Sequence, residues 1–466
     1  ANHKANAMTA VSALSAHERR VLERLCYGVS GLEARRVAEI GLDAWIEEQL
    51  AEVTVPDLDL RWRMRNLIVL DKDADAIEGV HKKMNVIEQM RTGTLLRQTY
   101  SRRQIFEMMV EFWSDHFNIS VEKGPGWALK VVDDREVIRR NAFGSFHDLL
   151  SASAHSPAML VYLDNHANQK HAPNENYARE LLELHTLGID GGYTQADIVE
   201  LARCLTGWSV KEYFWRGQFF FDEEVHDPGH KIVLGTHLEP TGKGEVEQVL
   251  DQLVKDPATA RHLSVKICRR FLCDHPEIEV PEWIVRLEQV YLVTRGNIKA
   301  MLRKLLLDGI ARDPTLLGKK FKRPVDFVVS AFRATNTTTD AGLPVQRFLG
   351  RMGQPTFAWP MPDGPPDQAV EWSSNLAPRW EFSLRLMAGL IEGSEPDVFW
   401  ADGNALNLSP DEMLQSASER LLGFTLREDV NGEMTQLVRE AGELEKGDIA
   451  RAIFAGLLSS PQFQQR

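Results

Sequence analysis

The amino-acid sequence predicts a mainly α-helical globular protein with one small β-ribbon. Along most of the chain, apolar residues recur at intervals of three and four, which is the period of amphipathic helices. Glycine, proline and N-capping residues divide this pattern into segments of ordinary helix length. An aromatic run and a β-branched run break the helical period, and both lie between residues 213 and 240.

Helices are expected on both sides of the ribbon region. Gly28 and Gly41 end two short helices near the N-terminus, and a Gly-Pro-Gly break precedes the helix that begins at Trp127. Before the ribbon, the main expected helices are His17–Gly28, Leu32–Ile40, Leu42–Val53, Ala76–Tyr100, Arg102–Phe117, Trp127–Arg140, Ser145–Ala154, Pro157–Leu163, Asn174–Gly188 and Gln195–Trp208. After it, they are Glu245–Val254, Thr259–Cys273, Pro281–Thr294, Ile298–Leu307, Val325–Ala334, Pro344–Met352, Pro378–Ile391, Pro410–Leu422 and Ile449–Leu458.

A proline-rich loop, Gln354–Glu371, interrupts the later helices. A loop of this length in a compact helical domain is usually functional or packed across a surface. The breaks in the pattern predict three parts. Residues 9–212 form an N-terminal helical domain, residues 213–240 a β-ribbon insertion, and residues 241–466 a C-terminal helical domain that packs against the first as one unit.

Composition limits the classes of partner. The 466-residue chain has a net charge of −13 and no cluster of Lys and Arg, which argues against nucleic acid and anionic membranes. No apolar run reaches the roughly 18 residues of a membrane span. The four cysteines lack the spacing of a zinc site and are expected to be buried thiols. A cytoplasmic location is favoured for the chain as given, and export if a signal peptide has been removed.

The segment Asn174–Gly188 is the most clearly bounded helix of the sequence. Asn174 can cap its first turn, and Gly188 can supply the left-handed residue that ends it. A helical projection places His185 in the middle of the apolar face and gives a polar face of Glu175, Asn176, Arg179, Glu180, Glu183 and Thr186. The helix therefore either exposes a charged ladder to solvent or is buried on both sides, with its polar face lining a site.

Histidines are concentrated in one quarter of the chain, because nine of the fourteen lie between His116 and His237. Several have a carboxylate close by in sequence, such as Asp115 beside His116 and Glu183 before His185. Neutral imidazole and carboxylate groups together suit zinc, iron or manganese, so a divalent transition metal is compatible with this set. No H-E-x-x-H segment occurs to supply two ligands, and hydrogen-bonded core histidines explain the same distribution.

The signature motifs of several enzyme classes are missing. The chain has no G-x-x-x-x-G-K-[ST], no G-x-G-x-x-G after a strand and no G-x-S-x-G. These absences argue against an NTPase, a Rossmann oxidoreductase and an α/β-hydrolase.

Several segments together resemble the bacterial "domain of unknown function 1800" family, from about His17 to the end of the chain. The matching stretches are Phe112–Phe117, Tyr162–Asn165, Asn174–Gly188, Gly191–Thr194, Ala202–Trp208, His226–Gly229, Lys322–Val325, Gly353–Pro355, Pro362–Gly364 and Leu458–Phe463. The family is defined by sequence, so the resemblance implies no reaction. One departure is that Ser114 and Asp115 stand where the family commonly has a second histidine.

The resemblance draws attention to residues inside these motifs. Those that could carry chemistry are His116, Asp164, Asn165, Asn174, Glu175, Arg179, Glu180, Glu183, His185, His226 and Asp227. The leading hypothesis is a hydrolytic or metal-assisted enzyme with its site around Asn174–Gly188. Glu180 or Glu183 would then be the general acid or base and Arg179 an anion clamp, with His185 as a further catalytic group. The expected metal ligands are His116, Asp164, His185 and His226.

The alternative hypothesis is a non-catalytic binding or assembly protein. Its partner, a small molecule or another protein, would dock on the aromatic segment Tyr213–Phe221 and on the loop Gln354–Glu371. Exposed aromatics also leave open a carbohydrate-acting protein, since such rings stack on sugars, although they are more often core residues.

Overall fold

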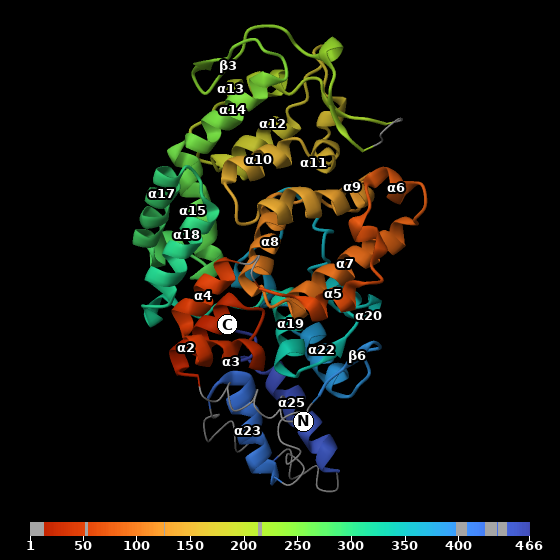
Figure 1. Ribbon diagram of the computed structural model, residues 1–466, viewed down its shortest axis with the longest axis vertical. Coiled ribbons are helices and arrows are strands. Elements are labelled where there is room, and N and C mark those ends of the chain that lie inside the picture. The colour runs from red at the N-terminus through yellow and green to blue at the C-terminus, as the bar shows by residue number, and fades with distance from the viewer. Residues whose placement is uncertain are drawn as a thin grey trace.

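Helix α8 (Gln104–His116) lies in the middle of an elongated arrangement of helices (Figure 1). Its apolar residues Ile105, Met108, Met109 and Trp113 are fully buried, as their helical spacing predicts. Its polar face is also enclosed, because α2, α4, α7 and a π-helical turn, η3, pack around it. A helix buried on all sides requires partners for every polar side chain that it carries.

The computed structural model describes residues 14–51, 55–124, 126–212, 217–397, 408–424, 436 and 445–466. Before residue 208 the other helical elements are α2 (Ala16–Leu25), α3 (Gly31–Ile40), α4 (Leu42–Leu50), α5 (Leu58–Met64), η2 (Ile68–Asp71), α6 (Ala74–Glu78), α7 (Lys83–Tyr100), α9 (Gly126–Val132), η3 (Asp133–Arg139), α10 (Phe146–Ala154), α11 (Pro157–Tyr162), η4 (Asn165–Ala167), α12 (Asn176–Glu180), η5 (Leu181–Thr186) and α13 (Gln195–Cys204). The predicted helix Ala76–Tyr100 is therefore split, since α6 ends at Glu78 and α7 begins at Lys83.

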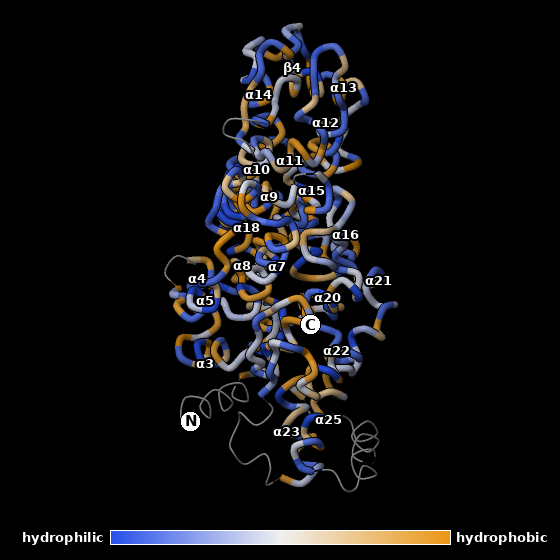
Figure 2. The backbone as a smooth tube through the Cα atoms, turned by 90° about the vertical axis from the view of Figure 1, so that its right-hand side faces the viewer, coloured by the Kyte–Doolittle hydropathy of each residue, from blue (hydrophilic) through white to orange (hydrophobic). Residues whose placement is uncertain are grey.

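Later in the chain the helical elements are η6 (Glu223–Val225), α14 (Gly244–Lys255), α15 (Pro257–Phe271), α16 (Pro276–Glu279), α17 (Pro281–Thr294), α18 (Ile298–Arg303), η7 (Lys304–Ile310), η8 (Pro314–Leu316), α19 (Pro324–Ala334), α20 (Leu343–Arg351), α21 (Ala369–Trp372), α22 (Ala377–Met387), α23 (Pro410–Leu422) and α25 (Lys446–Ser459). The mainly α fold is confirmed. Figure 2 shows apolar segments along the whole length of the molecule. Most buried apolar side chains, from Val21 to Phe463, form one cluster, and a smaller cluster around Val69 and Met90 lies apart from it.

Three antiparallel two-stranded ribbons make up the β-structure of the described residues. In the predicted ribbon region, β1 (Trp208–Val210) pairs with β2 (Phe219–Phe221), and β3 (Ile232–Val233) pairs with β4 (Thr236–His237). The aromatic and β-branched runs thus belong to separate hairpins, and residues 213–216 of the aromatic run lie outside the described residues. The third ribbon, β5 (Thr338–Thr339) with β6 (Ser394–Glu395), lies far away in sequence.

The predicted helix Asn174–Gly188 is present as α12 followed directly by the π-helical turn η5. Asn174 Oδ1 accepts a hydrogen bond from the Asn176 backbone N–H at 2.9 Å, and Gly188 ends the helix with a φ of +85°. The π turn adds a residue per turn and changes which side chains share a face. Thr186, predicted on the polar face, is therefore fully buried, and its hydroxyl donates to the Leu181 carbonyl at 2.6 Å.

Two predictions from composition agree with the structure. All four cysteines are buried and free of disulfides. Among the described residues, no helix combines the length and the apolar character needed to cross a lipid bilayer.

Candidate functional site

A cavity of about 50 Å³ lies beside the acidic face of α8, and we call it the α8 pocket. Glu107, Glu111 and Asp115 follow one another at four-residue spacing, so they share one face of the helix. The pocket is closed by α7, by η3 and by the proline-rich loop; the residues that these elements contribute include Thr94, Gln98, Asp134, Arg139, Gln354, Phe357 and Trp359. The proline-rich loop thus forms one wall of the pocket.

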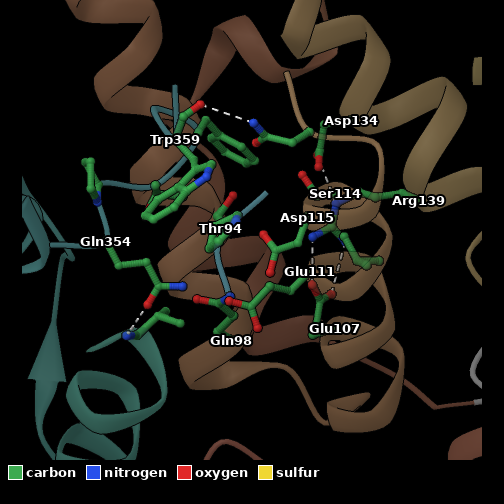
Figure 3. Close-up of a pocket in the computed structure, with 17 residues that line it drawn as sticks. Thr94, Gln98, Glu107, Glu111, Ser114, Asp115, Asp134, Arg139, Gln354 and Trp359 are labelled. Atoms are coloured by element: carbon green, nitrogen blue, oxygen red, sulfur yellow. Dashed lines mark hydrogen bonds and ion pairs between the residues drawn. The ribbon is translucent and has the colours of Figure 1, made fainter. Parts of the chain in front are cut away.

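The three carboxylates point in different directions (Figure 3). Glu107 is turned toward Arg139, which binds both of its oxygens at 3.1 and 2.6 Å and also binds Asp134 at 3.1 Å. Glu111 and Asp115 are turned toward the side of the pocket where Gln98, Gln354 and Trp359 lie. Glu107 is therefore neutralised by a bidentate guanidinium, which leaves Glu111 and Asp115 as the carboxyl groups that face the pocket.

Glu111 uses one oxygen for three hydrogen bonds. Its Oε2 accepts from the Tyr27 hydroxyl at 2.7 Å, from Arg270 at 2.9 Å and from Arg323 at 2.6 Å. Every one of these donors stabilises negative charge on that oxygen. Glu111 is therefore held as a fixed anion on the pocket wall.

Asp115 has one bound and one free oxygen. Arg323 donates to its Oδ2 at 2.8 Å, whereas Oδ1 has no hydrogen-bond partner among the described residues. The Asp115 side chain is 24% exposed to solvent, and it lines the pocket. Burial raises the pKa of Asp115 to about 7, the Glu111 charge adds to the shift, and Arg323 opposes it. At neutral pH the protonated and ionised forms of Asp115 are both populated.

The proline-rich loop is fastened to the end of α8. Asn118 donates from its side-chain amide to the carbonyls of Trp359 and Met361, at 3.1 and 2.6 Å. The Tyr162 hydroxyl donates to the Pro360 carbonyl at 2.9 Å. A side chain at Gly364, whose φ is +76°, would collide with the backbone oxygen of Asp115. The loop is thus held in place as a cover over the pocket.

A buried ion network continues from the pocket toward α19. Arg323 also lies within ion-pair distance of Asp326 at 3.3 Å and of Asp367 at 3.9 Å. Arg466 binds Asp326 at 3.1 Å, and the guanidinium groups of Arg466, Arg323 and Arg270 hold the pKa of Asp326 well below its usual value. Arg323 is the hub of this network, because it contacts four carboxylates.

The histidines of the predicted site form a second cluster next to α8. His116 and His185 are buried, with ring centroids 6.1 Å apart, and His262 of α15 lies at the same distance from His116. His116 donates from Nε2 to the His185 carbonyl at 3.0 Å, and its Nδ1 accepts from Lys266 Nζ at 2.9 Å. His262 Nε2 donates to the Leu184 carbonyl at 3.1 Å.

These contacts give two of the histidines a structural role. The carbonyls of Leu184 and His185 lie in the last turn of the helix, where no backbone N–H is left to bind them. The imidazoles of His262 and His116 take that place. Burial lowers the pKa of His262 to about 4 and that of His185 to about 3, so both rings are neutral at physiological pH. Neither ring nitrogen of His185 has a hydrogen-bond partner in the described part of the chain.

Three of the predicted catalytic residues, Arg179, Glu180 and Glu183, lie on the half-buried polar side of the Asn174–Gly188 helix, whereas the fourth, His185, is buried. Arg179 binds Glu175 at 3.0 Å and Gln195 at 3.1 Å, and Glu183 accepts a 3.4 Å hydrogen bond from Tyr193. Partial burial raises the pKa of Glu180, and the Glu183 charge adds to the effect. Their assignment as catalytic groups stays a prediction.

The predicted metal ligands are not brought together. Asp164 pairs with Lys123 at 2.8 Å, and His226 lies in another cluster, 3.3 Å from Glu245, which also binds Lys231 at 2.7 Å. Only His116 and His185 are neighbours, and both nitrogens of His116 are already occupied. Within the described ranges, no three His, Cys, Asp or Glu side chains converge as a metal site requires.

The surfaces named for the alternative hypothesis are largely engaged within the chain. The proline-rich loop is held on α8, as described above. Phe219 of the aromatic run packs on Trp208 and His155, with ring centroids 5.1 and 4.8 Å apart. Both segments therefore contribute to internal packing.

Sequence reasoning missed Glu111, Arg323 and the role of Asp115. A signal was present, since the spacing of Glu107, Glu111 and Asp115 puts carboxylates on a helix whose opposite face is rich in large apolar residues. Asp115 and Arg323 also lie inside two of the family-like motifs, Phe112–Phe117 and Lys322–Val325. In the first motif, the residue type of His116 predicts a role in a site more strongly than that of Asp115 does.

Comparison with known proteins identifies a family. The family model described as "Protein of unknown function (DUF1800)" matches residues 20–465. No curated protein and no solved structure matches the chain. Because the match covers nearly the whole sequence, the chain belongs to the DUF1800 family of proteins of unknown function.

Proposed function

We propose that this protein is an enzyme of the hydrolytic type that works by acid–base catalysis in the α8 pocket, with Asp115 as the proton donor and acceptor. The observation that carries the proposal is the arrangement of Asp115: one oxygen is fixed by Arg323, and the other is free and lines the pocket. A general acid–base group works best when its pKa lies near the operating pH, and Asp115 meets this condition.

Glu111 complements Asp115 in the proposed reaction. One carboxyl group that exchanges a proton beside one that stays ionised is a recurrent arrangement in hydrolases. In the proposed step, protonated Asp115 donates its proton to the leaving atom of the substrate, while Glu111 orients a water molecule and stabilises developing positive charge. The free oxygen of Asp115 then accepts a proton from the attacking water, which restores the acid.

The size of the cavity limits what can react. A buried water needs roughly 10–15 Å³ of such space, so about 50 Å³ holds a few waters or one small functional group. We therefore expect the reacting bond to lie at the end of a substrate, with the remainder outside the pocket or beneath a displaced proline-rich loop.

A metal-assisted reaction is not part of this proposal, because the ligands predicted for it are dispersed. The histidine cluster supports the site indirectly. His116 follows Asp115 on α8, and it ties the end of this helix to the Asn174–Gly188 helix.

The test compares Asp115→Asn with wild type on chromogenic esters, phosphate esters and glycosides. Asparagine keeps the shape and one hydrogen-bond acceptor but cannot exchange the proton, so we expect kcat/KM to fall by about 100-fold or more with Tm nearly retained. Asp308→Asn, a change at an exposed residue of η7, serves as the matched control and should retain full activity. Wild-type turnover by Asp115→Asn would contradict the proposal.

A further inference from the structure

A second cavity, of about 380 Å³, lies between α2, the Leu317–Lys322 segment and the C-terminal helices, and we call it the basic cavity. Among the described residues, its lining contains one acidic residue, Glu23, and seven basic ones: Arg19, Arg20, Arg24, Lys319, Lys322, Arg420 and Arg466. This excess is unexpected in a chain with a net charge of −13. The cavity is also in the size range of small-molecule sites.

Arg19 and Arg466 of this cavity are paired with Glu23 and Asp326, whereas Arg24 and Lys322 have no ion pair among the described residues. Arg24 is 1% exposed, and its guanidinium donates to the carbonyls of Phe271 and Leu272 at 2.8 and 2.6 Å, and also to those of Gly318 and Arg466. Burial and the charges of Arg466 and Arg20 lower the pKa of Arg24 to about 9. Main-chain oxygens orient the guanidinium, and no Asp or Glu side chain of the described residues pairs with it.

Lys322 is the residue that most needs a partner. It is 7% exposed, and its Nζ lies 3.6 Å from the centre of the Phe463 ring. Among the described residues, its Nζ has no hydrogen-bond acceptor and no carboxylate within 4.0 Å. Burial lowers the pKa of Lys322 to about 7; Arg466 and Arg379 add to the shift, and Glu23 and Asp326 oppose it. A buried lysine that lines a cavity and has an aromatic ring but no oxygen atom as a partner is an unfilled site for negative charge.

We propose that the basic cavity binds a small organic oxyanion, with its carboxylate or phosphate head at Lys322 and a short apolar body against the cavity wall. Arg20 and Lys319, both exposed at the edge of the cavity, would approach the head group from the solvent side. The body would contact apolar side chains of the lining, namely Val29, Leu317, Leu421, Leu422, Phe424 and Phe463. Inorganic anions would bind more weakly, because they bury no apolar surface.

The experiment measures Tm and heats of binding at constant ionic strength with hexanoate, hexyl phosphate and hexanol. Wild-type protein should gain at least about 2 °C in Tm with one or both anions and nothing with hexanol. Binding returns charge to Lys322, so at pH 8 it should take up as much as about one proton, which calorimetry in buffers of different ionisation enthalpy detects. A structural lysine would give no proton uptake.

Lys322→Met keeps the length of the side chain, removes its charge and suits an apolar environment. The variant should therefore fold, but it should lose both the gain in Tm and the proton uptake on addition of the anions. Arg20→Gln changes an exposed residue and should weaken binding several-fold. Lys255→Met, at an exposed lysine on α14, is the matched control and should bind as wild type does. The proposal is overturned if neither anion stabilises the protein, if hexanol stabilises it equally, or if Lys322→Met retains the proton uptake.

Discussion

The desolvated carboxyl of Asp115 makes the stability of the protein depend on pH. Its pKa is about 7 in the folded chain and about 3.8 when exposed, so between these values the folded state holds a proton that the unfolded state releases. The free energy of unfolding therefore falls as pH rises from about 4 to about 7. This contribution is at most about 4 kcal/mol.

Asp115→Asn removes this dependence. We predict that the Tm of the variant, relative to wild type, is lowest near pH 4.5 and increases toward pH 8, where wild type carries a desolvated charge. Thermal denaturation of both proteins across this range provides the measurement. A Tm difference that stays constant with pH would show that Asp115 titrates alike in both states.

The partners of Asp115 show which properties of single residues can be predicted from the sequence and which cannot. The carboxylate spacing on α8 is local and can be read from the sequence. Arg323, which fixes Asp115, is 208 residues away and reaches it only through the packing of α19 on the rest of the fold. His116 was identified in advance because of its residue type, but its two hydrogen bonds, which assign it a structural role, depend on η5 and α15.

At the scale of elements, the spacing of apolar residues and the residue types at helix ends predicted most helices well. The predicted helices Leu32–Ile40 and Arg102–Phe117 correspond closely to α3 and α8. The π turn η5 could not be predicted, because it results from tertiary packing of a segment whose sequence is ordinary for an α-helix. The helical projection assumed an α-helix throughout, so it placed the buried Thr186 on the polar face.

The end of the Asn174–Gly188 helix gives a prediction at the same scale. Gly188 and Gly389 each follow the end of a helix with a positive φ, +85° and +68°, but a side chain at Gly188 would lie 2.9 Å from His262 Nδ1, whereas no described atom lies within 4 Å of a side chain at Gly389. Gly389→Ala should therefore cost about 1–2 kcal/mol through its backbone conformation alone. Gly188→Ala should cost more, because it also displaces the His262 ring from the Leu184 carbonyl.

Urea denaturation of the two alanine variants provides the comparison. Equal losses of unfolding free energy would mean that the His262 contact contributes nothing to the stability of the helix end. A larger loss for Gly188→Ala supports the role of the histidine cluster as the cap of this helix.

At the scale of the whole molecule, Arg323 connects elements that are distant in sequence. It binds Glu111 and Asp115 on α8, Asp326 on α19 and Asp367 in the proline-rich loop. Arg323→Met leaves buried carboxylates without their shared cation, so we expect a loss of about 3–5 kcal/mol of unfolding free energy.

The predicted division of the chain into domains at residues 212 and 240 stays a prediction.

The matched control is Arg312→Met, which removes an exposed ion pair with Asp43. Surface pairs of this kind contribute little, so its free energy of unfolding should be nearly that of wild type. Chemical denaturation measures both variants. Similar small losses in the two proteins would contradict the role of Arg323 as the hub of a buried network.

The most direct test of the proposed function is the titration of Asp115 itself. Infrared difference spectroscopy of wild type against Asp115→Asn, recorded from pH 5 to pH 9, isolates the C=O stretch of this one protonated carboxyl. We predict a protonated Asp115 at pH 5 whose signal disappears around pH 7. A carboxyl that is already ionised at pH 5 would contradict it, because Asp115 could then donate no proton at neutral pH.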